Sequence, residues 1–231
     1  MTDNQIIRLN KVSKLYQMGE VRFTALDQVS ISICNGEFVT VMGPSGSGKS
    51  TLLNMIAGID QPSNGEIFIT GHAIHDMNEN RLATWRGEHM GIIFQFFQLL
   101  PALSLLHNVM LPMDFAHKYS SKERFQRARD LLDKVGIADQ ADKLPGMVSG
   151  GQQQRAAIAR SLANDPPLIV ADEPTGNLDS SATGKIFELF HLLVEQGKTL
   201  LMVTHDKELA RQVPRVIEIM DGRIIKDDSS Q

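Results

Sequence analysis

The sequence predicts an α/β protein with a mainly parallel sheet and a helical insertion. A glycine-rich loop, GPSGSGKST at 43–51, joins a strand-like run to a helix-like run. Strand-sized apolar runs alternate with helical segments again in the last third of the chain, which is typical of parallel sheets with right-handed crossovers. A stretch with helical periodicity lies between these parts. A second glycine-rich loop, VSGGQQQR at 148–155, raises the question of why one chain has two.

Composition indicates a globular protein of one domain and excludes several function classes. The chain has 231 residues, of which 42% are hydrophobic and 22% charged, as in ordinary globular proteins. Its formal net charge of −4 argues against a nucleic-acid partner. Cys34 is the single cysteine, so no internal disulfide can form, which suits a reducing compartment. Since no apolar run approaches the ~20 residues of a membrane span and no secretion signal is evident, a cytoplasmic chain is expected.

The N-terminal part is predicted to consist mainly of strands. Apolar runs at 6–12, 25–33 and 37–42 have strand length and are bounded by turn residues. After the first glycine loop, the apolar residues of 51–59 recur at helical spacing. The segment SNGEIFITG at 63–71 predicts a hairpin.

The middle of the chain predicts two helices. In the segment 120–136, Ser120 and Glu123 form a capping box pattern and Gly136 ends the helix. Its apolar stripe consists of Phe125, Ala128, Leu131, Leu132 and Val135. The second glycine loop then opens an alanine-rich helix at 155–165.

The last third returns to alternating strands and helices. Strands are predicted at 168–174, 199–206 and 215–225, with helices at 181–197 and 207–213. This order completes the expected parallel sheet.

The loop at 43–51 has the composition of a nucleotide-binding site. Gly43, Gly46 and Gly48 allow backbone N–H groups to face an anion, and the following helix points its positive end at the same place. Lys49 is predicted to reach the β- and γ-phosphates, and the Ser50 hydroxyl to supply a ligand for Mg²⁺. An idle glycine turn is the alternative, which the strand-then-helix context disfavours.

Polar residues also follow the strands. Carboxylates at the end of a buried strand lie at the rim where open α/β sheets bind ligands. Asp172 is therefore expected to hold Mg²⁺ through its hydration shell, and Glu173 to act as the base that polarises the attacking water, with an acidic turn before a proline as the alternative. His205 is predicted to contact the γ-phosphate, although a lone histidine there is more often structural. The Gln95 amide can reach Mg²⁺ or the attacking water.

The ordered motifs GPSGSGKST, FQ, VSGGQQQR, LIVADEP, NLDS and VTHD resemble the ATP-binding subunit of an ABC transporter, over almost the whole chain. The SGGQ signature is specific to this family, whereas the first loop is shared by many NTPases. The resemblance implies a P-loop NTPase core with an N-terminal antiparallel β subdomain and an α-helical subdomain insertion. It implies one ABC ATPase domain over 1–231, divided into a nucleotide-binding core at 1–94 and 161–231 and a helical subdomain with the signature loop at 95–160.

The same resemblance answers the question of the second loop. Two subunits are implied to face each other head to tail, so that the signature of one holds the γ-phosphate bound to the other. A glycine loop without a lysine or a metal ligand is a poor ATP site on its own. Tyr16 is implied to stack on adenine, though alone it would read as an ordinary strand aromatic, and Asp179 to lie at the dimer seam. The implied nucleotide contacts are Tyr16, Gly43, Pro44, Ser45, Gly46, Ser47, Gly48, Lys49, Ser50, Thr51, Ser149, Gly150, Gly151, Gln152 and Asp179, with Ser50, Gln95 and Asp172 at Mg²⁺.

The chain departs from the family pattern at two positions. Val148 stands where leucine is usual before the signature, a volume change that should leave the phosphate contacts intact. His107 stands where glutamate is frequent, which affects a local cap or a partner contact rather than the chemistry.

A membrane partner is implied near Gln95. The segment QFFQLLPALSLL places the apolar residues Phe96, Phe97, Leu99 and Leu100 directly after it. Covering the helical insertion is one role for these residues. The resemblance implies that they form a groove for a cytoplasmic helix of an integral membrane permease.

The function implied is that of a homodimeric ATPase, using ATP and Mg²⁺ and peripheral on the inner face of the membrane. ADEPTGNLDS and FQFFQLLPALSLLHNV resemble the lipoprotein-release and macrolide-export branch, so export or extraction of lipophilic cargo is expected. An ABC ATPase that controls cell division or the cell wall through a permease-like partner is the alternative. A P-loop phosphotransferase would give the signature no role, and a catalytically inactive binding module would not need the reactive residues that are present.

Overall fold

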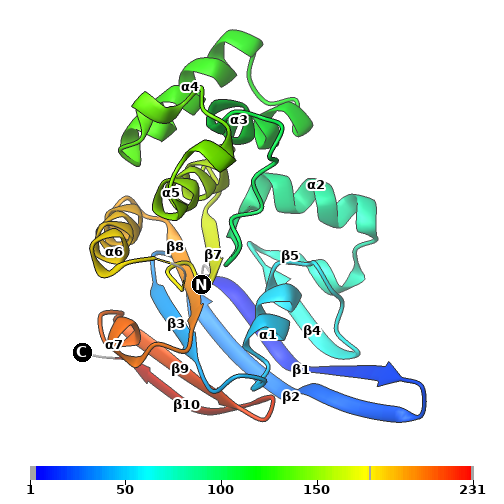
Figure 1. Ribbon diagram of the computed structural model, residues 1–231. Coiled ribbons are helices and arrows are strands. Elements are labelled where there is room, and N and C mark those ends of the chain that lie inside the picture. Colours follow the sequence, from blue (N-terminus) through cyan, green and yellow to red (C-terminus); the bar gives the residue numbers. More distant parts are fainter. Residues whose placement is uncertain (1–3, 177, 230–231) are drawn as a thin grey trace.

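Two β-sheets form the framework of the protein in its computed structural model, which describes residues 4–176 and 178–229 (Figure 1). The antiparallel sheet has the order β2-β1-β4-β5 and consists of β1 (Gln5–Met18), β2 (Val21–Cys34), β4 (Asn64–Ile69) and β5 (His72–Ala73). The second sheet has the order β10-β9-β3-β8-β7-β6 and consists of β3 (Phe38–Met42), β6 (Met90–Ile93), β7 (Leu168–Asp172), β8 (Thr199–Thr204), β9 (Arg215–Met220) and β10 (Arg223–Ser229).

The second sheet is parallel except at one edge. Strands β9, β3, β8, β7 and β6 run parallel, whereas β10 folds back on β9 as a hairpin. The predicted parallel sheet is thus confirmed. Because parallel strands end at the same edge of a sheet, the chain leaves β3, β8, β7 and β6 on one side of the molecule.

Helices connect the strands. They are α1 (Lys49–Ile56), α2 (Glu79–His89), α3 (Leu105–Phe115), α4 (Ser121–Lys134), α5 (Gly150–Ser161), α6 (Ser180–Glu195) and α7 (Lys207–Ala210), with short 3₁₀ turns at 74–76, 138–140 and 145–147. None of the helices in the described ranges 4–176 and 178–229 is both long and apolar enough to cross a membrane.

Two hydrophobic cores hold these layers together. In the first, Leu52 of α1 is buried with residues of both sheets, such as Val29 and Val41. In the second, Phe190 of α6 and Ile158 of α5 are buried in one cluster with residues of the second sheet. Helix α1, which begins in the glycine loop, is therefore fixed from both sheets.

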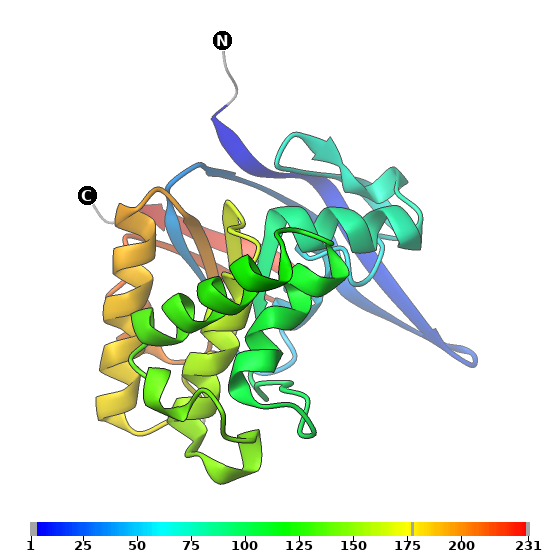
Figure 2. The same cartoon turned by 90° about the horizontal axis from the view of Figure 1, so that it is seen from above.

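Helices α3, α4 and α5 gather at one end of the molecule, away from the antiparallel sheet (Figures 1 and 2). Helix α4 has the predicted capping box between Ser120 and Glu123, and Gly136 follows its end with φ 68°. One position of the predicted apolar stripe is wrong, because Phe125 is 43% exposed. It lies in the first turns of the helix, whereas the packing of α4 against the core starts at Ala128.

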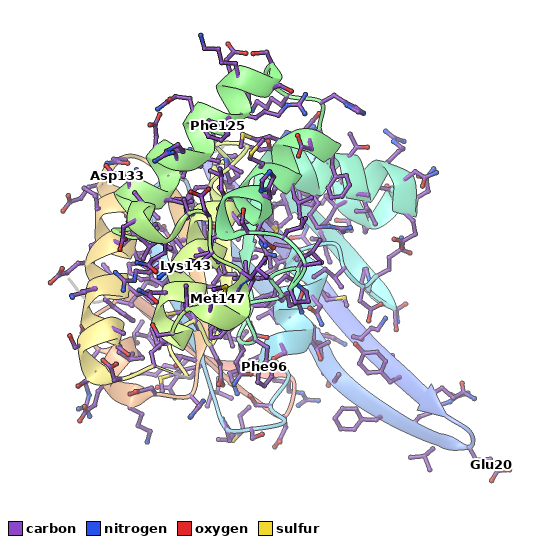
Figure 3. The ribbon with its side chains drawn as sticks, turned by 45° about the horizontal axis from the view of Figure 1, so that its top comes forward. Glu20, Phe96, Phe125, Asp133, Lys143 and Met147 are labelled. Carbon is purple, nitrogen blue, oxygen red and sulfur yellow. The ribbon has the colours of Figure 1, made fainter. Side chains whose placement is uncertain are left out.

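The first two strands are longer than the sequence predicted, which was 6–12 and 25–33. Strand β1 continues to Met18 and β2 begins at Val21, so the two form a long ribbon with Glu20 at its tip (Figure 3). These added residues are mostly exposed and lack a buried face, and hence lack the periodicity from which a strand is predicted.

Candidate functional site

The glycine loop is packed so tightly that two of its glycines cannot be replaced without movement. A Cβ atom at Gly43 would lie 2.1 Å from the carbonyl oxygen of Ile219, and one at Gly48 would lie 2.5 Å from that of Ala25. Gly48 also has φ 104° and caps α1, a conformation that favours glycine. The loop is thereby held against β9 and β2 with its backbone N–H groups at the start of α1, where anions bind.

Lys49 is buried beneath this loop. It is 7% exposed, and its Nζ donates to the carbonyl oxygens of Gly43 at 2.9 Å and Pro44 at 2.8 Å. Carbonyl dipoles hold an ammonium group without cancelling its charge. An anion placed over the loop would therefore find both the cation and the N–H donors already arranged.

Ser47 lies in the interior of the loop. Ser47 Oγ is buried and has no hydrogen-bond partner in the described residues, while its backbone oxygen accepts from Gly222 N–H at 2.9 Å. The loop is thus tied to the β9–β10 turn from inside, and the donors that suit a polyphosphate are its N–H groups and the Lys49 ammonium.

Ser50 and Asp172 offer hard oxygen ligands side by side. Ser50 Oγ lies 3.5 Å from Asp172 Oδ1, although α1 and β7 are distant in sequence. Burial raises the pKa of Asp172, the negative charge of Glu173 raises it further, and Ser50 and Lys49 oppose the shift. Mg²⁺ prefers a small number of such oxygens together with phosphate and water oxygens, so the pair fits this ion.

Glu173 is held at three points. Its backbone N–H donates to Val203 O at 2.9 Å, His205 Nδ1 lies 2.7 Å from its Oε1, and Gln95 Nε2 donates to its Oε2 at 3.3 Å. Its φ of 44° is unusual for a residue with a side chain, and such strain is frequent at functional sites. A carboxylate fixed in this manner can accept a proton from a water molecule within hydrogen-bond distance.

One cavity of about 750 Å³ gathers most of the predicted residues. Those lining it are Pro44, Ser45, Gly46, Gly48, Lys49, Ser50, Thr51, Gln95, Asp172, Glu173 and His205, together with Phe23 and Ala25. Gln95 follows β6, Asp172 ends β7, His205 follows β8 and the glycine loop follows β3. Neighbouring parallel strands therefore bring these groups to one edge. Gly43 and Ser47 belong to the same loop but do not line the cavity.

The signature loop lies outside this set. Ser149 is the N-cap of α5: its Oγ accepts from Gln152 N–H at 3.3 Å, and Gln152 Oε1 accepts from Ser149 N–H at 2.9 Å. Gly150 and Gly151 occupy the first helical turn, where N–H groups have no partner within the helix. The loop thus presents a second anion-binding helix start.

Asp179 lies close to the signature loop and has a local role. It caps α6 by accepting from Ala182 N–H at 2.8 Å. A Cβ atom at Gly151 would lie 3.4 Å from Cβ of Ala182, so the starts of α5 and α6 are in contact. Asn177 of the NLDS motif lies outside the described residues.

Tyr16 lies beside the cavity rather than in its lining, and sequence reasoning missed its neighbour Phe23. The two residues pair directly across β1 and β2. Tyr16 is 37% and Phe23 57% exposed, and such exposure of paired aromatic residues points to a ligand or partner. Phe23 lies in the exposed part of β2, where no buried face gives a periodic signal, and only its pairing with Tyr16 could have indicated it.

The apolar loop after Gln95 is partly exposed. Phe96, labelled in Figure 3, is 72% exposed and Leu100 is 48% exposed. Arg160 near the end of α5 holds the loop, since its guanidinium donates to the carbonyl oxygens of Gln98 at 2.5 Å and Phe97 at 2.8 Å. The loop behind Gln95 is thereby fastened to the helix that begins at the signature.

Comparison with known proteins agrees with this arrangement. The family model described as ABC transporter matches residues 26–176. An uncharacterised ABC transporter ATP-binding protein of Thermotoga maritima is 48% identical over 220 residues, which is 95% of this chain and 94% of that protein. The macrolide export ATP-binding/permease protein MacB of Photorhabdus laumondii is 44% identical over 228 residues, which is 99% of this chain but 35% of MacB.

A solved structure matches the fold as a whole. It is the dimeric, post-hydrolysis state of the ATP-binding cassette MJ0796 with ADP and Pi, a protein of Methanocaldococcus jannaschii. The TM-score is 0.92 at 43% identity, covering 97% of this chain and 99% of the other. The antiparallel and helical subdomains predicted from the motifs are therefore confirmed as parts of this fold. The chain belongs to the ABC transporter family, as one of its ATP-binding, ATP-hydrolysing proteins.

Proposed function

We propose that two copies of this chain close head to tail around two ATP molecules and drive a separate membrane permease. The observation that carries this proposal is the separation of two phosphate-binding devices. The cavity contains the lysine loop and the acidic residues but, in the described part of the chain, is not lined by the signature residues 149–152. If the signature binds the nucleotide of the neighbouring subunit, the presence of two phosphate-binding loops and their separation are both explained. The dimeric state of MJ0796 supports the same arrangement.

The chain's own groups divide the chemistry between them. Lys49 and the N–H groups of the loop bind and orient the phosphates. Ser50 and Asp172, with Gln95 at the same rim, would hold Mg²⁺, which neutralises phosphate charge when bound. Glu173 accepts a proton from the attacking water while the water oxygen adds in line to the γ-phosphorus. The bond from the γ-phosphorus to the oxygen that bridges it to the β-phosphate breaks, so that ADP and inorganic phosphate leave. His205 fixes the Glu173 carboxylate and reaches toward the γ-phosphate.

Other parts of the chain bind the adenine base and transmit the closing movement. Tyr16 offers a ring face on which adenine stacks, and Phe23 supplies a second apolar wall beside it. The division into a nucleotide-binding core at 1–94 and 161–231 and a helical subdomain at 95–160 places the break next to Gln95. Movement of the helical part on closure would then reach Gln95 and the loop behind it.

The permease is proposed to dock on the loop that contains Phe96, Phe97, Leu99 and Leu100. The exposure of Phe96 beside Gln95 supports this surface, which would keep the protein on the inner face of the cell membrane. Similarity to MacB, a macrolide export protein, favours export or extraction of lipophilic cargo. The match to MacB spans only 35% of that protein, so it leaves control of cell division or of the cell wall through a permease-like partner as the second candidate.

A Glu173→Gln variant tests the central proposal. Glutamine keeps the size of Glu173 and one acceptor oxygen but is not a base, so hydrolysis should fall about 10²-fold or more while ATP binding is retained. The variant should elute as a dimer in ATP and as a monomer without it. Adding Lys49→Ala should return it to a monomer, because the phosphates lose their cation. Turnover at the wild-type rate, or a monomer at saturating ATP, would overturn the proposal.

A further inference from the structure

We propose that Asp60, together with Lys14, is a positioning residue for the nucleotide base, acting by fixing the ring of Tyr16. This inference rests on the proposed stacking of adenine on Tyr16. Asp60 lies in the turn after α1, outside the motifs discussed above.

The contacts form a closed network. The Tyr16 hydroxyl donates to Asp60 Oδ2 at 2.8 Å, and Lys14 Nζ donates to Asp60 Oδ1 at 2.6 Å. The Gln61 N–H also donates to Oδ1 at 2.7 Å, and Lys14 donates to Gln61 O at 2.7 Å. Both carboxylate oxygens are thus engaged, and Tyr16 is anchored to a side chain that the Gln61 N–H and Lys14 hold in place.

Anchoring matters here because Tyr16 lies on the ribbon of β1 and β2 that projects from the molecule (Figure 3). The ring is 37% exposed, and packing alone therefore leaves it room to turn. A stacking partner that is already immobilised binds more tightly, because its rotamer freedom is not lost on binding.

Lys14 also determines which face of the ring a base can use. Its Nζ lies over the Tyr16 ring, 5.0 Å from the centroid. That face is covered by the ammonium, so a base stacks on the opposite face. Lys14 is itself only 13% exposed along its side chain, consistent with a fixed position.

Protonation of the two partners favours the network. Burial raises the pKa of the Tyr16 hydroxyl, and hydrogen bonding to Asp60 raises it further, so it remains a donor. Burial acts to raise the pKa of Asp60, but the hydrogen bonds from Lys14, Tyr16 and the Gln61 N–H together lower it. The carboxylate therefore stays ionised near neutral pH.

Helix α1 connects the base to the phosphates. It begins at Lys49 and ends at Ile56, and the N–H groups of Ile59 and Asp60 donate back to Asn54 O at 2.9 and 3.3 Å. The start of α1 therefore binds the phosphates while the turn after its end holds the ring that binds the base. Both parts of the nucleotide are aligned to one rigid element.

The test compares ATP with inorganic tripolyphosphate, which occupies the phosphate loop but has no base. Asp60→Ala, and separately Tyr16→Phe, which removes only the hydroxyl, should each raise the Kd for ATP about threefold to tenfold. The Kd for tripolyphosphate should not change in either variant. Asp133→Asn, an exposed change on α4 (labelled in Figure 3), is the matched control and should alter neither ligand.

A double-mutant cycle shows whether Asp60 acts through Tyr16. In Tyr16→Phe protein, Asp60→Ala should have little further effect on ATP binding. Full additivity, or an equal loss of tripolyphosphate binding, would overturn the positioning role. Failure of the stacking proposal is distinguishable, because Tyr16→Ala would then leave ATP binding unchanged. If Tyr16→Ala weakens ATP binding but Asp60→Ala and Tyr16→Phe do not, only the present inference is wrong.

Discussion

Ser149 is expected to have two separable functions, and two substitutions distinguish them. Its hydroxyl caps α5, accepting from Gln152 N–H at 3.3 Å, and in the proposed dimer it also faces the γ-phosphate of the neighbour. Aspartate caps a helix as well as serine does, whereas alanine does not. Ser149→Asp should therefore keep the cap and place a negative charge against the phosphate, while Ser149→Ala loses the cap without adding charge.

The expected magnitudes differ in a way that can be measured. Loss of the cap in Ser149→Ala should cost about 1 kcal/mol, and a chain of 231 residues should then unfold about 2–4 °C lower. Ser149→Asp should change stability by less than about 0.5 kcal/mol. A unit charge about 4 Å from the phosphate costs about 4 kcal/mol at an effective dielectric constant of 20, which is roughly a thousandfold per composite site.

Both variants are best made in the Glu173→Gln background, where hydrolysis does not remove the ATP. Thermal unfolding without nucleotide reports the cap, and sizing at several protein concentrations with ATP reports the dimer. ATP binding to the monomer should be unchanged in Ser149→Asp. The head-to-tail reasoning is refuted if Ser149→Asp dimerises with ATP as readily as its parent, or if it loses ATP binding as a monomer.

Three further predictions concern the site and its supports. Because burial raises the pKa of Asp172, this carboxylate should become protonated at a higher pH than an ordinary aspartate. The ratio of the Mg²⁺ affinity of the wild type to that of Asp172→Asn, in which the protonation of ATP cancels, should therefore fall as the pH drops from 7 toward the raised pKa. A ratio that stays constant would contradict this. In Gly43→Ala the new Cβ would lie 2.1 Å from Ile219 O, so the free energy of unfolding measured in urea should fall by about 3 kcal/mol or more. In Gly46→Ala no atom lies within 4 Å of the new Cβ, and the loss should be about 1 kcal/mol. Equal losses would be inconsistent with the packing described. Arg160→Met removes the donor of one part-buried and one exposed carbonyl oxygen, which should cost about 0.5–1.5 kcal/mol each, and it should increase hydrogen exchange in 96–100 but not in α4.

Local features of the fold were predictable because the residues that cause them are close in sequence. Ser120 and Glu123 form a capping box within one helical turn, and the glycine loop needs only the strand before it and the helix after it. Phe125 shows the limit of such reasoning. Helical spacing places it on the apolar stripe, but the spacing does not state where along α4 the neighbouring helices begin to cover it.

The phosphate loop and the acidic strand end could be predicted from the sequence, since each is a short pattern whose chemistry is carried by adjacent residues, whereas the ABC ATPase fold and the role of the signature followed from the resemblance of the ordered motifs to a known family. Which groups meet in space depends on the packing of distant segments. Gln95 and His205 converge on Glu173 because β6, β8 and β7 are neighbours in the sheet, and strand order is not encoded in any short segment. The contact of Asp60 with Tyr16 and the place of Phe23 in the cavity likewise depend on how the turn after α1 and the ribbon of β1 and β2 pack. Contacts between segments far apart in the chain are set by the whole core, and a linear pattern of side chains does not contain them.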